Sequence, residues 1–243
     1  ARVSRDWCGF AVDAIERETG GVAIYINGAI GDVNPARTGG ADAARALGDA
    51  VAAAAVASMR DARAAGDALR IDMRVLEVPM HLERLSQRVN DTLARAGFAL
   101  AMLGKVGGMQ AASSALHAAG RADLAQIVAA LRGMSERRII HRDEGTFIAS
   151  HCGYVSVGDG FDALAAPGEV MTRLALPLRG AMAAPHRMIF GLTQDALGYF
   201  IPEDEWMTGR NNNYEESVSP GKRAGAALAD ALLQIVPHRG VTT

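Results

Sequence analysis

The side chains best able to do chemistry in this sequence gather in three short loops, 27–35, 167–169 and 191–199. Together the loops supply carboxylates, amides, a phenol and several glycines, which are groups that can hold a metal ion, orient water or hydrogen-bond a carbonyl. Each loop follows a segment with the pattern of a buried strand. Because ligands of open α/β sheets gather outside the carboxyl ends of strands, we expect the three loops to border one site.

The first loop, 27–35, combines two glycines with polar side chains. Glycine lets backbone N–H groups approach a ligand closely, so Asn27 and Gly28 are candidates for substrate binding. Asp32 offers a carboxylate and Asn34 an amide that both donates and accepts, which makes these two the candidate catalytic residues. A Gly-Asp turn with a purely structural role is the alternative for this loop.

The other two loops each contribute an oxygen donor that could ligate a metal. Glu169 follows a predicted strand directly and could be a metal ligand or a general base, or an acid favoured at a helix N-terminus. Tyr199 closes the third loop and could be a ligand or a half-buried packing tyrosine. Asp195, in the same loop, is a further candidate for substrate binding.

Composition and motifs exclude several classes of protein. The 243 residues are 49% hydrophobic, and the net charge of −2 lacks the basic excess that a nucleic-acid backbone requires. No Gly-x-Ser-x-Gly elbow, phosphate loop, dinucleotide fingerprint or His-Glu-x-x-His motif is present. Two cysteines are too few for a disulfide scaffold, and no run approaches the ~20 apolar residues of a membrane span.

Periodicity predicts an α/β fold with a mixed β-sheet covered by helices and a helical insertion at about 81–135. The residues 1–243 are expected to form one α/β domain, the C-terminal part of a longer catalytic domain. The helices are predicted at 4–18, 41–66, 171–182 and 224–235, and the strands at 22–26, 70–80, 146–159, 161–167 and 188–192.

The three loops, taken in order, resemble the neutral or alkaline non-lysosomal ceramidase family. The resemblance consists of Asn-Gly-x-x-Gly-Asp-Val-x-Pro, then Pro-Gly-Glu, then Gly-Leu followed by a tyrosine, and finally Tyr214-Glu215. It spans residues 4 to about 236 and corresponds to the latter part of that family's catalytic domain. The sequence is most similar to uncharacterised bacterial members, which need not act on ceramide.

The resemblance implies a zinc ion held by two histidines, a glutamate and a tyrosine, with Glu169 and Tyr199 at the last two positions. The family's histidine motifs lie upstream of Ala1, so an upstream segment or a companion chain is expected to supply those ligands. Asn34 stands where the family has a nucleophilic serine, and an amide cannot form an acyl-enzyme. Its expected role is to hydrogen-bond the substrate carbonyl or a water. The histidines of this chain, none of which lies in such a motif, are His81, His117, His141, His151, His186 and His238.

The expected activity is therefore zinc-dependent hydrolysis of an amide or similar acyl bond in a small molecule or lipid. The alternative is a non-catalytic, ceramidase-like module that binds lipid or envelope components. An upstream Thr-His-x-His segment would favour the enzyme, and its lack would favour the binding module. The composition is typical of a bacterial protein and leaves both the cytoplasm and secretion open.

Overall fold

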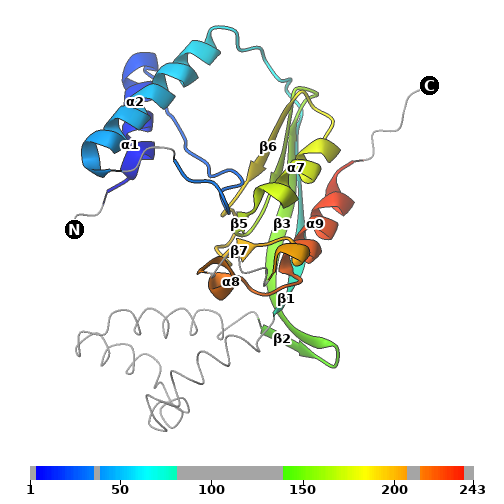
Figure 1. Cartoon of the computed structure of the whole chain (residues 1–243). Helices are drawn as coiled ribbons and strands as arrows, with labels where there is room; N and C mark the ends of the chain where they lie inside the picture. The colour runs from blue at the N-terminus through cyan, green and yellow to red at the C-terminus, as the bar shows by residue number, and fades with distance from the viewer. Residues whose placement is uncertain (1–3, 36–38, 81–138, 207–213, 238–243) are drawn as a thin grey trace, which may run out of the picture.

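The computed structural model describes residues 4–35, 39–80, 139–206 and 214–237. Figure 1 shows a mixed α/β fold, as the sequence predicts, with a sheet flanked by helices. The predicted helical insertion at about 81–135 lies outside the described residues. None of the described helices is long and apolar enough to cross a membrane.

Among the described residues two helices precede five strands, and the last two strands lie between helices. In chain order the elements are α1 (Asp6–Thr19), α2 (Gly40–Met59), β1 (Leu69–Met80), β2 (Ile139–Arg142), β3 (Gly145–Val157), β4 (Phe161–Ala165), β5 (Glu169–Val170), α7 (Thr172–Ala181), β6 (His186–Phe190), β7 (Tyr199–Phe200), the 3-10 turn η1 (Glu203–Glu205), α8 (Tyr214–Val218) and α9 (Ala224–Ile235).

The central sheet has the strand order β1-β3-β4-β6, with β2 also pairing with β3. β3 runs antiparallel to its three neighbours, whereas β4 and β6 are parallel. β5 and β7 form a separate parallel pair. Because β5 follows the carboxyl end of β4 closely, this small pair lies at the sheet edge where ligands are expected.

One face of the sheet carries the hydrophobic core, and α9 and α7 cover it. Leu228 and Leu232, one helical turn apart on α9, are fully buried against the sheet residues Val78 and Leu164. Leu178 of α7 joins the same cluster. Burial of each such side chain contributes about 1.5–3 kcal/mol, so this face holds the helices in place.

The helices α1 and α2 pack against each other and not onto the core. A Cβ on Gly48 of α2 would lie only 2.6 Å from the Trp7 carbonyl oxygen and the Phe10 Cβ of α1, so the absent side chain permits the close approach. Arg45 also lies 4.4 Å over the Phe10 ring. Figure 1 shows this pair on the side of the sheet opposite α7 and α9.

Two predictions for the N-terminal part are wrong. The segment 22–26, predicted as a buried strand, forms no strand and belongs to neither sheet, and Val22 and Ile24 are 89% and 81% exposed. The helix predicted at 41–66 ends at Met59. Tertiary contacts override helix propensity there, because Gly160 N–H donates to the Ala65 carbonyl at the β3–β4 turn, 3.2 Å away.

The C-terminal half follows the prediction more closely. The strands around the turn at 158–160, the helix α7 despite Pro177, and α9 are confirmed. β6 begins two residues before its predicted start. The strands β2, β5 and β7 were not predicted, because four or two residues carry no detectable periodicity.

Candidate functional site

Glu169 and Tyr199 lie side by side on the paired strands β5 and β7, where they occupy opposite register positions. The Tyr199 hydroxyl donates a hydrogen bond to the Glu169 carboxylate. Both residues are half-buried. The expectation that these two sequence-distant residues meet at one sheet edge is therefore confirmed.

The pKa of Glu169 is raised above its usual value of 4.5, and burial is the main cause. The hydrogen bond from Tyr199 opposes this rise, because it stabilises the carboxylate. The charge of Glu215, from α8, adds to it through repulsion. Two acids and a phenol therefore share this edge, an arrangement in which a cation would relieve the repulsion.

All three loops predicted to border the site meet here through backbone hydrogen bonds. Gly191 N–H donates to the Asn27 carbonyl over 2.8 Å, and Leu192 N–H donates to the Gly168 carbonyl over 3.1 Å. Gly31 N–H donates to the Val170 carbonyl over 3.0 Å. The loop 27–35 is thus joined to the strand that carries Glu169.

Two glycines make this convergence possible. A Cβ on Gly191 would lie 2.4 Å from the Gly28 carbonyl oxygen, and one on Gly168 would lie 2.4 Å from the Gly198 carbonyl oxygen. Both obstacles are backbone atoms, which cannot move aside cheaply. Gly168 and Gly191 therefore allow the loops to pack closely against one another. A Cβ on Gly28 would lie 3.8 Å from the Ile189 carbonyl oxygen of β6, at ordinary contact distance.

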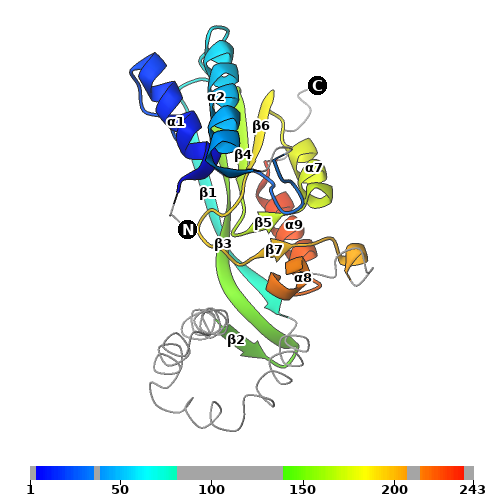
Figure 2. The ribbon, with the colours of Figure 1, turned by 60° about the vertical axis from the view of Figure 1, so that its left-hand side comes forward.

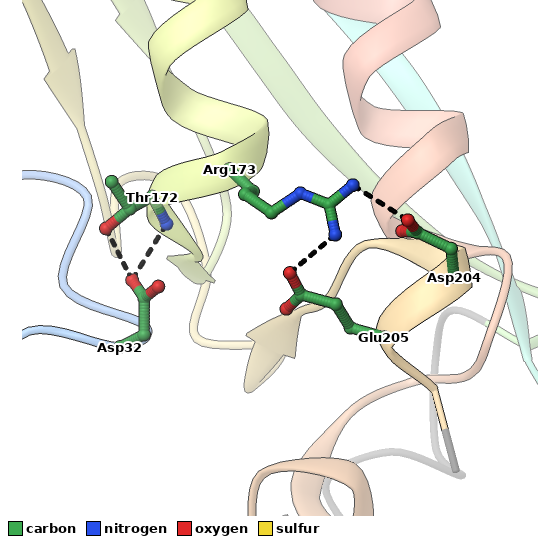
Figure 3. A network of polar contacts seen from close by, with 5 residues as sticks. All are labelled: Asp32, Thr172, Arg173, Asp204 and Glu205. Atoms are coloured by element: carbon green, nitrogen blue, oxygen red, sulfur yellow. Dashed lines mark hydrogen bonds and ion pairs between the residues drawn. The ribbon is translucent and has the colours of Figure 1, made fainter. Parts of the chain in front are cut away.

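Asp32 caps the helix α7 from a distant part of the chain. Its Oδ1 atom accepts the Thr172 N–H over 2.8 Å and the Thr172 hydroxyl over 2.6 Å. Figure 3 shows this contact beside Arg173, which pairs with Asp204 and Glu205 at 2.7 Å each. The N-cap residue Met171 offers no side-chain acceptor, so Asp32 takes that place.

The remaining residues of the first loop differ in burial. The Asn27 side chain is half-buried, and its carbonyl takes part in the loop junction. Asn34 is exposed, two residues beyond Asp32. The amide of Asn34 is therefore accessible to an incoming ligand from solvent.

Asp195 links the third loop to the central sheet. Its Oδ2 atom accepts a hydrogen bond from the buried Ser150 hydroxyl of β3 over 3.0 Å, and its Oδ1 atom accepts the Ala196 N–H over 3.0 Å. Two residues of this loop, Leu192 and Gln194, adopt left-handed φ angles of 54° and 63°. Such strain is unusual for non-glycine residues and is found preferentially at functional sites.

Sequence reasoning missed Asp162, which is only 1% exposed within β4. It accepts hydrogen bonds from the Tyr154 hydroxyl at 2.7 Å and from the Ala183 and Ala184 N–H groups at 3.1 and 2.9 Å. These bonds tie β4 to the segment between α7 and β6. A single acid within an apolar strand gives no sequence signal for such a role.

Nowhere in the described ranges do three or more His, Cys, Asp or Glu side chains form a group that could hold a metal ion. His186 pairs with Phe161 at the start of β4 and β6, the end of these strands away from Glu169. His151 is exposed on β3. Glu169 and Tyr199 are therefore the metal-binding candidates that the described structure brings together.

No protein-family model and no curated protein matches this sequence. Solved structures do match: the neutral ceramidase from Pseudomonas aeruginosa aligns with 96% of this chain at a TM-score of 0.55 and 17% identity. A structure described as a ceramidase complexed with C2 aligns with 96% at the same TM-score and 14% identity. The fold is thus part of the ceramidase fold. The chain spans 40% and 42% of the lengths of those two solved chains.

Proposed function

We propose that this chain is part of a zinc-dependent hydrolase that cleaves an amide or similar acyl bond, with Glu169 and Tyr199 as two of the metal ligands. The observation that carries this proposal is the in-register, hydrogen-bonded pair of these residues on β5 and β7. The pair lies within a fold shared with a neutral ceramidase. A small-molecule or lipid amide is the proposed substrate.

The donor chemistry of the site fits zinc in part. A carboxylate and a phenol are oxygen donors, and the nearby Glu215 charge makes a cation favourable. Catalytic zinc sites normally have three protein ligands, and the pair supplies two. The proposal therefore includes histidine ligands from an upstream segment or companion chain, so that residues 1–243 form one unit of a longer catalytic domain.

A zinc ion bound here would supply a Lewis acid for the substrate carbonyl and lower the pKa of water. Glu169 and Tyr199 would lose their mutual hydrogen bond and give up a proton on binding the cation, because ligands bind deprotonated. Asn34, exposed at the end of the first loop, would hydrogen-bond the carbonyl or a water. Asn27, Gly28 and Asp195 would border the substrate.

Asp32 has a positioning role in this scheme. Its Oδ1 atom is occupied by Thr172, so it holds the loop that carries Asn34 against α7. The carboxylate thereby acts on substrate through Asn34. This differs from the direct catalytic role expected from sequence, and the two roles are separable by mutation.

The alternative, a non-catalytic module that binds lipid or envelope components, is favoured by one feature. Asn34 stands where the ceramidase resemblance places a nucleophilic serine. Zinc and activity measurements decide between the two. The binding module would take up no stoichiometric zinc under any condition and would release no free acid from an N-acyl amine.

The test is zinc stoichiometry and hydrolysis of fluorogenic N-acyl amines, measured on the 243-residue chain alone and on the chain with its upstream polypeptide. The chain alone should bind zinc weakly, and the combination should bind one zinc and hydrolyse the amide. Glu169→Ala should abolish both properties, whereas Glu144→Ala, an exposed glutamate in the β2–β3 turn, should not. Tight one-to-one zinc on the chain alone, or normal zinc in Glu169→Ala, would overturn the ligand assignment.

A further inference from the structure

Consecutive residues at the junction of β5 and α7 bond alternately to two different segments. The N–H groups of Glu169 and Met171 donate over 2.8 and 3.2 Å to two carbonyls of the segment 198–200, which contains β7. Between them, the Val170 carbonyl accepts the Gly31 N–H of the first loop over 3.0 Å. Successive backbone groups of a strand point to opposite edges, so the first loop lies along one edge of β5 and β7 along the other. Figures 1 and 2 both show β5 and β7 side by side between α7 and α8.

Two side chains of α7 continue this arrangement past the end of β5. Thr172 bonds to Asp32 of the first loop, at 2.8 and 2.6 Å. Arg173, the next residue, donates from its two terminal nitrogens to Asp204 and Glu205 at 2.7 Å each, as Figure 3 shows. Both acids belong to η1, which begins three residues after β7 ends. We call Arg173, Asp204 and Glu205 the η1 clamp, because they join α7 to the turn that follows β7.

The turn η1 consists of three consecutive acids, which repel one another unless cations lie nearby. Lys222, which precedes α9, lies 3.7 Å from Glu203, and Arg173 pairs with the other two acids. The hydrogen bond from Arg173 holds the pKa of Asp204 below its usual value. Removing the guanidinium would take this countercharge from two of the three adjacent carboxylates, and their repulsion would favour a looser turn.

We propose that Arg173 is a positioning residue of the candidate metal site: by binding η1 it keeps β7 paired with β5, and so keeps Tyr199 beside Glu169. β5 and β7 have two residues each, and so short a ladder has little stability of its own. Arg173 acts through β7 and takes no part in the hydrogen bond between Tyr199 and Glu169. The inference rests on the proposed function, which makes Glu169 and Tyr199 metal ligands, but the clamp forms without zinc.

The η1 clamp makes the site sensitive to salt. The side chains of Arg173, Asp204 and Glu205 are 59%, 66% and 23% exposed. Exposed ion pairs are screened by salt, with a Debye length of about 3 Å at 1 M, so high salt imitates the loss of Arg173. The competing explanation is an ion pair that stabilises the whole chain and has no particular effect on β7. The two explanations differ in which amides respond when the clamp is removed.

The test measures amide hydrogen exchange by NMR on the full 243-residue chain without metal. Arg173→Ala should speed exchange of the Glu169 and Met171 amides, which bond across to the β7 segment, by about three- to tenfold. The Gly191 amide, which bonds to the first loop instead, is the reference and should change by less than about twofold. Salt at about 1 M should reproduce the effect in the wild type and add little in Arg173→Ala. Arg179→Ala, at an exposed arginine in the last turn of α7, is the matched control and should leave all three amides unchanged.

A second measurement connects the η1 clamp to the metal ligands. With the upstream polypeptide present, Arg173→Ala should weaken zinc binding by about three- to tenfold. Arg173→Lys, which keeps the charge but not the planar fork, should restore part of the affinity that Arg173→Ala loses. Glu205→Gln added to Arg173→Ala should have less than about twofold further effect, because both substitutions remove the same contact.

Four results would overturn the proposal. They are equal acceleration at Gly191, no acceleration at Glu169 and Met171, an equal effect of Arg179→Ala, and unchanged zinc affinity in Arg173→Ala when the wild type binds the ion. Absence of zinc from the wild type with its upstream polypeptide would overturn the proposed function instead. The exchange measurements would then still decide whether Arg173 positions β7, so the two proposals can fail separately.

Discussion

Replacing Asp32 by alanine should destabilise the chain without touching its hydrophobic core. The substitution removes two hydrogen bonds, from the Thr172 N–H at 2.8 Å and from the Thr172 hydroxyl at 2.6 Å. Loss of an N-cap acceptor costs about 1 kcal/mol. The hydroxyl can turn to water, because the contact is exposed, so its loss adds about 0.5–1 kcal/mol.

The expected loss of unfolding free energy is therefore about 1.5–2 kcal/mol, or a fall in Tm of roughly 3–8 °C for a chain of this size. Asp32→Asn should retain most of the stability, because asparagine is an equally good cap. Denaturant unfolding at fixed pH measures both values. Asn34→Ala, two residues away and exposed, is the control and should change stability by less than about 0.5 kcal/mol.

The same variants separate a positioning role of Asp32 from a direct catalytic one. If Asp32 acts by capping, Asp32→Asn retains activity in the assembled enzyme along with stability. Full stability with lost activity in Asp32→Asn would show that the carboxylate charge itself is used in the reaction. An Asp32→Ala variant as stable as the wild type would refute the capping argument altogether.

Three further predictions concern the loop junction, the thiols and the titration of the site. Gly191→Ala should destabilise the folded chain by about 1–3 kcal/mol, because the new Cβ would lie 2.4 Å from a backbone carbonyl oxygen. Gly180→Ala on α7, where a Cβ would have nothing within 4 Å, should stabilise the chain by about 0.5–1 kcal/mol, and chemical denaturation compares the two variants. Burial raises the pKa of Cys152 to about 11, so a thiol reagent at pH 8 should label the half-buried Cys8 first and Cys152 only on unfolding. Glu169→Gln should raise Tm at pH 7, because a carboxyl group whose pKa is higher in the folded than in the unfolded protein destabilises the fold once it is ionised. The gain in Tm should fade below pH 4.5, where the carboxyl is protonated in both states. A gain that does not depend on pH would contradict this cause.

Hydrophobic periodicity and turn residues predicted the helices and strands that bury one apolar face. The helix α9 repeats apolar residues at helical spacing, and the glycine-flanked turn at 158–160 signals the β3–β4 connection. The meeting of Glu169 and Tyr199 could also be predicted, because both follow strands that end at the same edge. Local pattern and tertiary packing agree at these positions.

The failures arise where contacts between distant segments decide the structure. Residues 22–26 have the composition of a buried strand, yet a strand needs a ladder partner, and the described sheets offer none to Ile24. The two-residue strands β5 and β7 pair where Gly168, which has no side chain, lets the Gly198 carbonyl come close. No window of local sequence contains that information.

Two of the three non-glycine residues with left-handed φ angles in the described structure lie at the edge that carries Glu169, and the third is Asp6 of α1. Leu192 and Gln194 hold left-handed backbone angles there, and the Glu169 carboxylate is partly buried beside another acid. By contrast, the buried Asp162 is satisfied by three hydrogen-bond donors. Strain and charge repulsion that occur together are features that selection for stability alone would remove, so they favour a role for this edge in binding or catalysis. A cation there would convert the repulsion into ligation, which connects the cost in stability directly to the proposed chemistry.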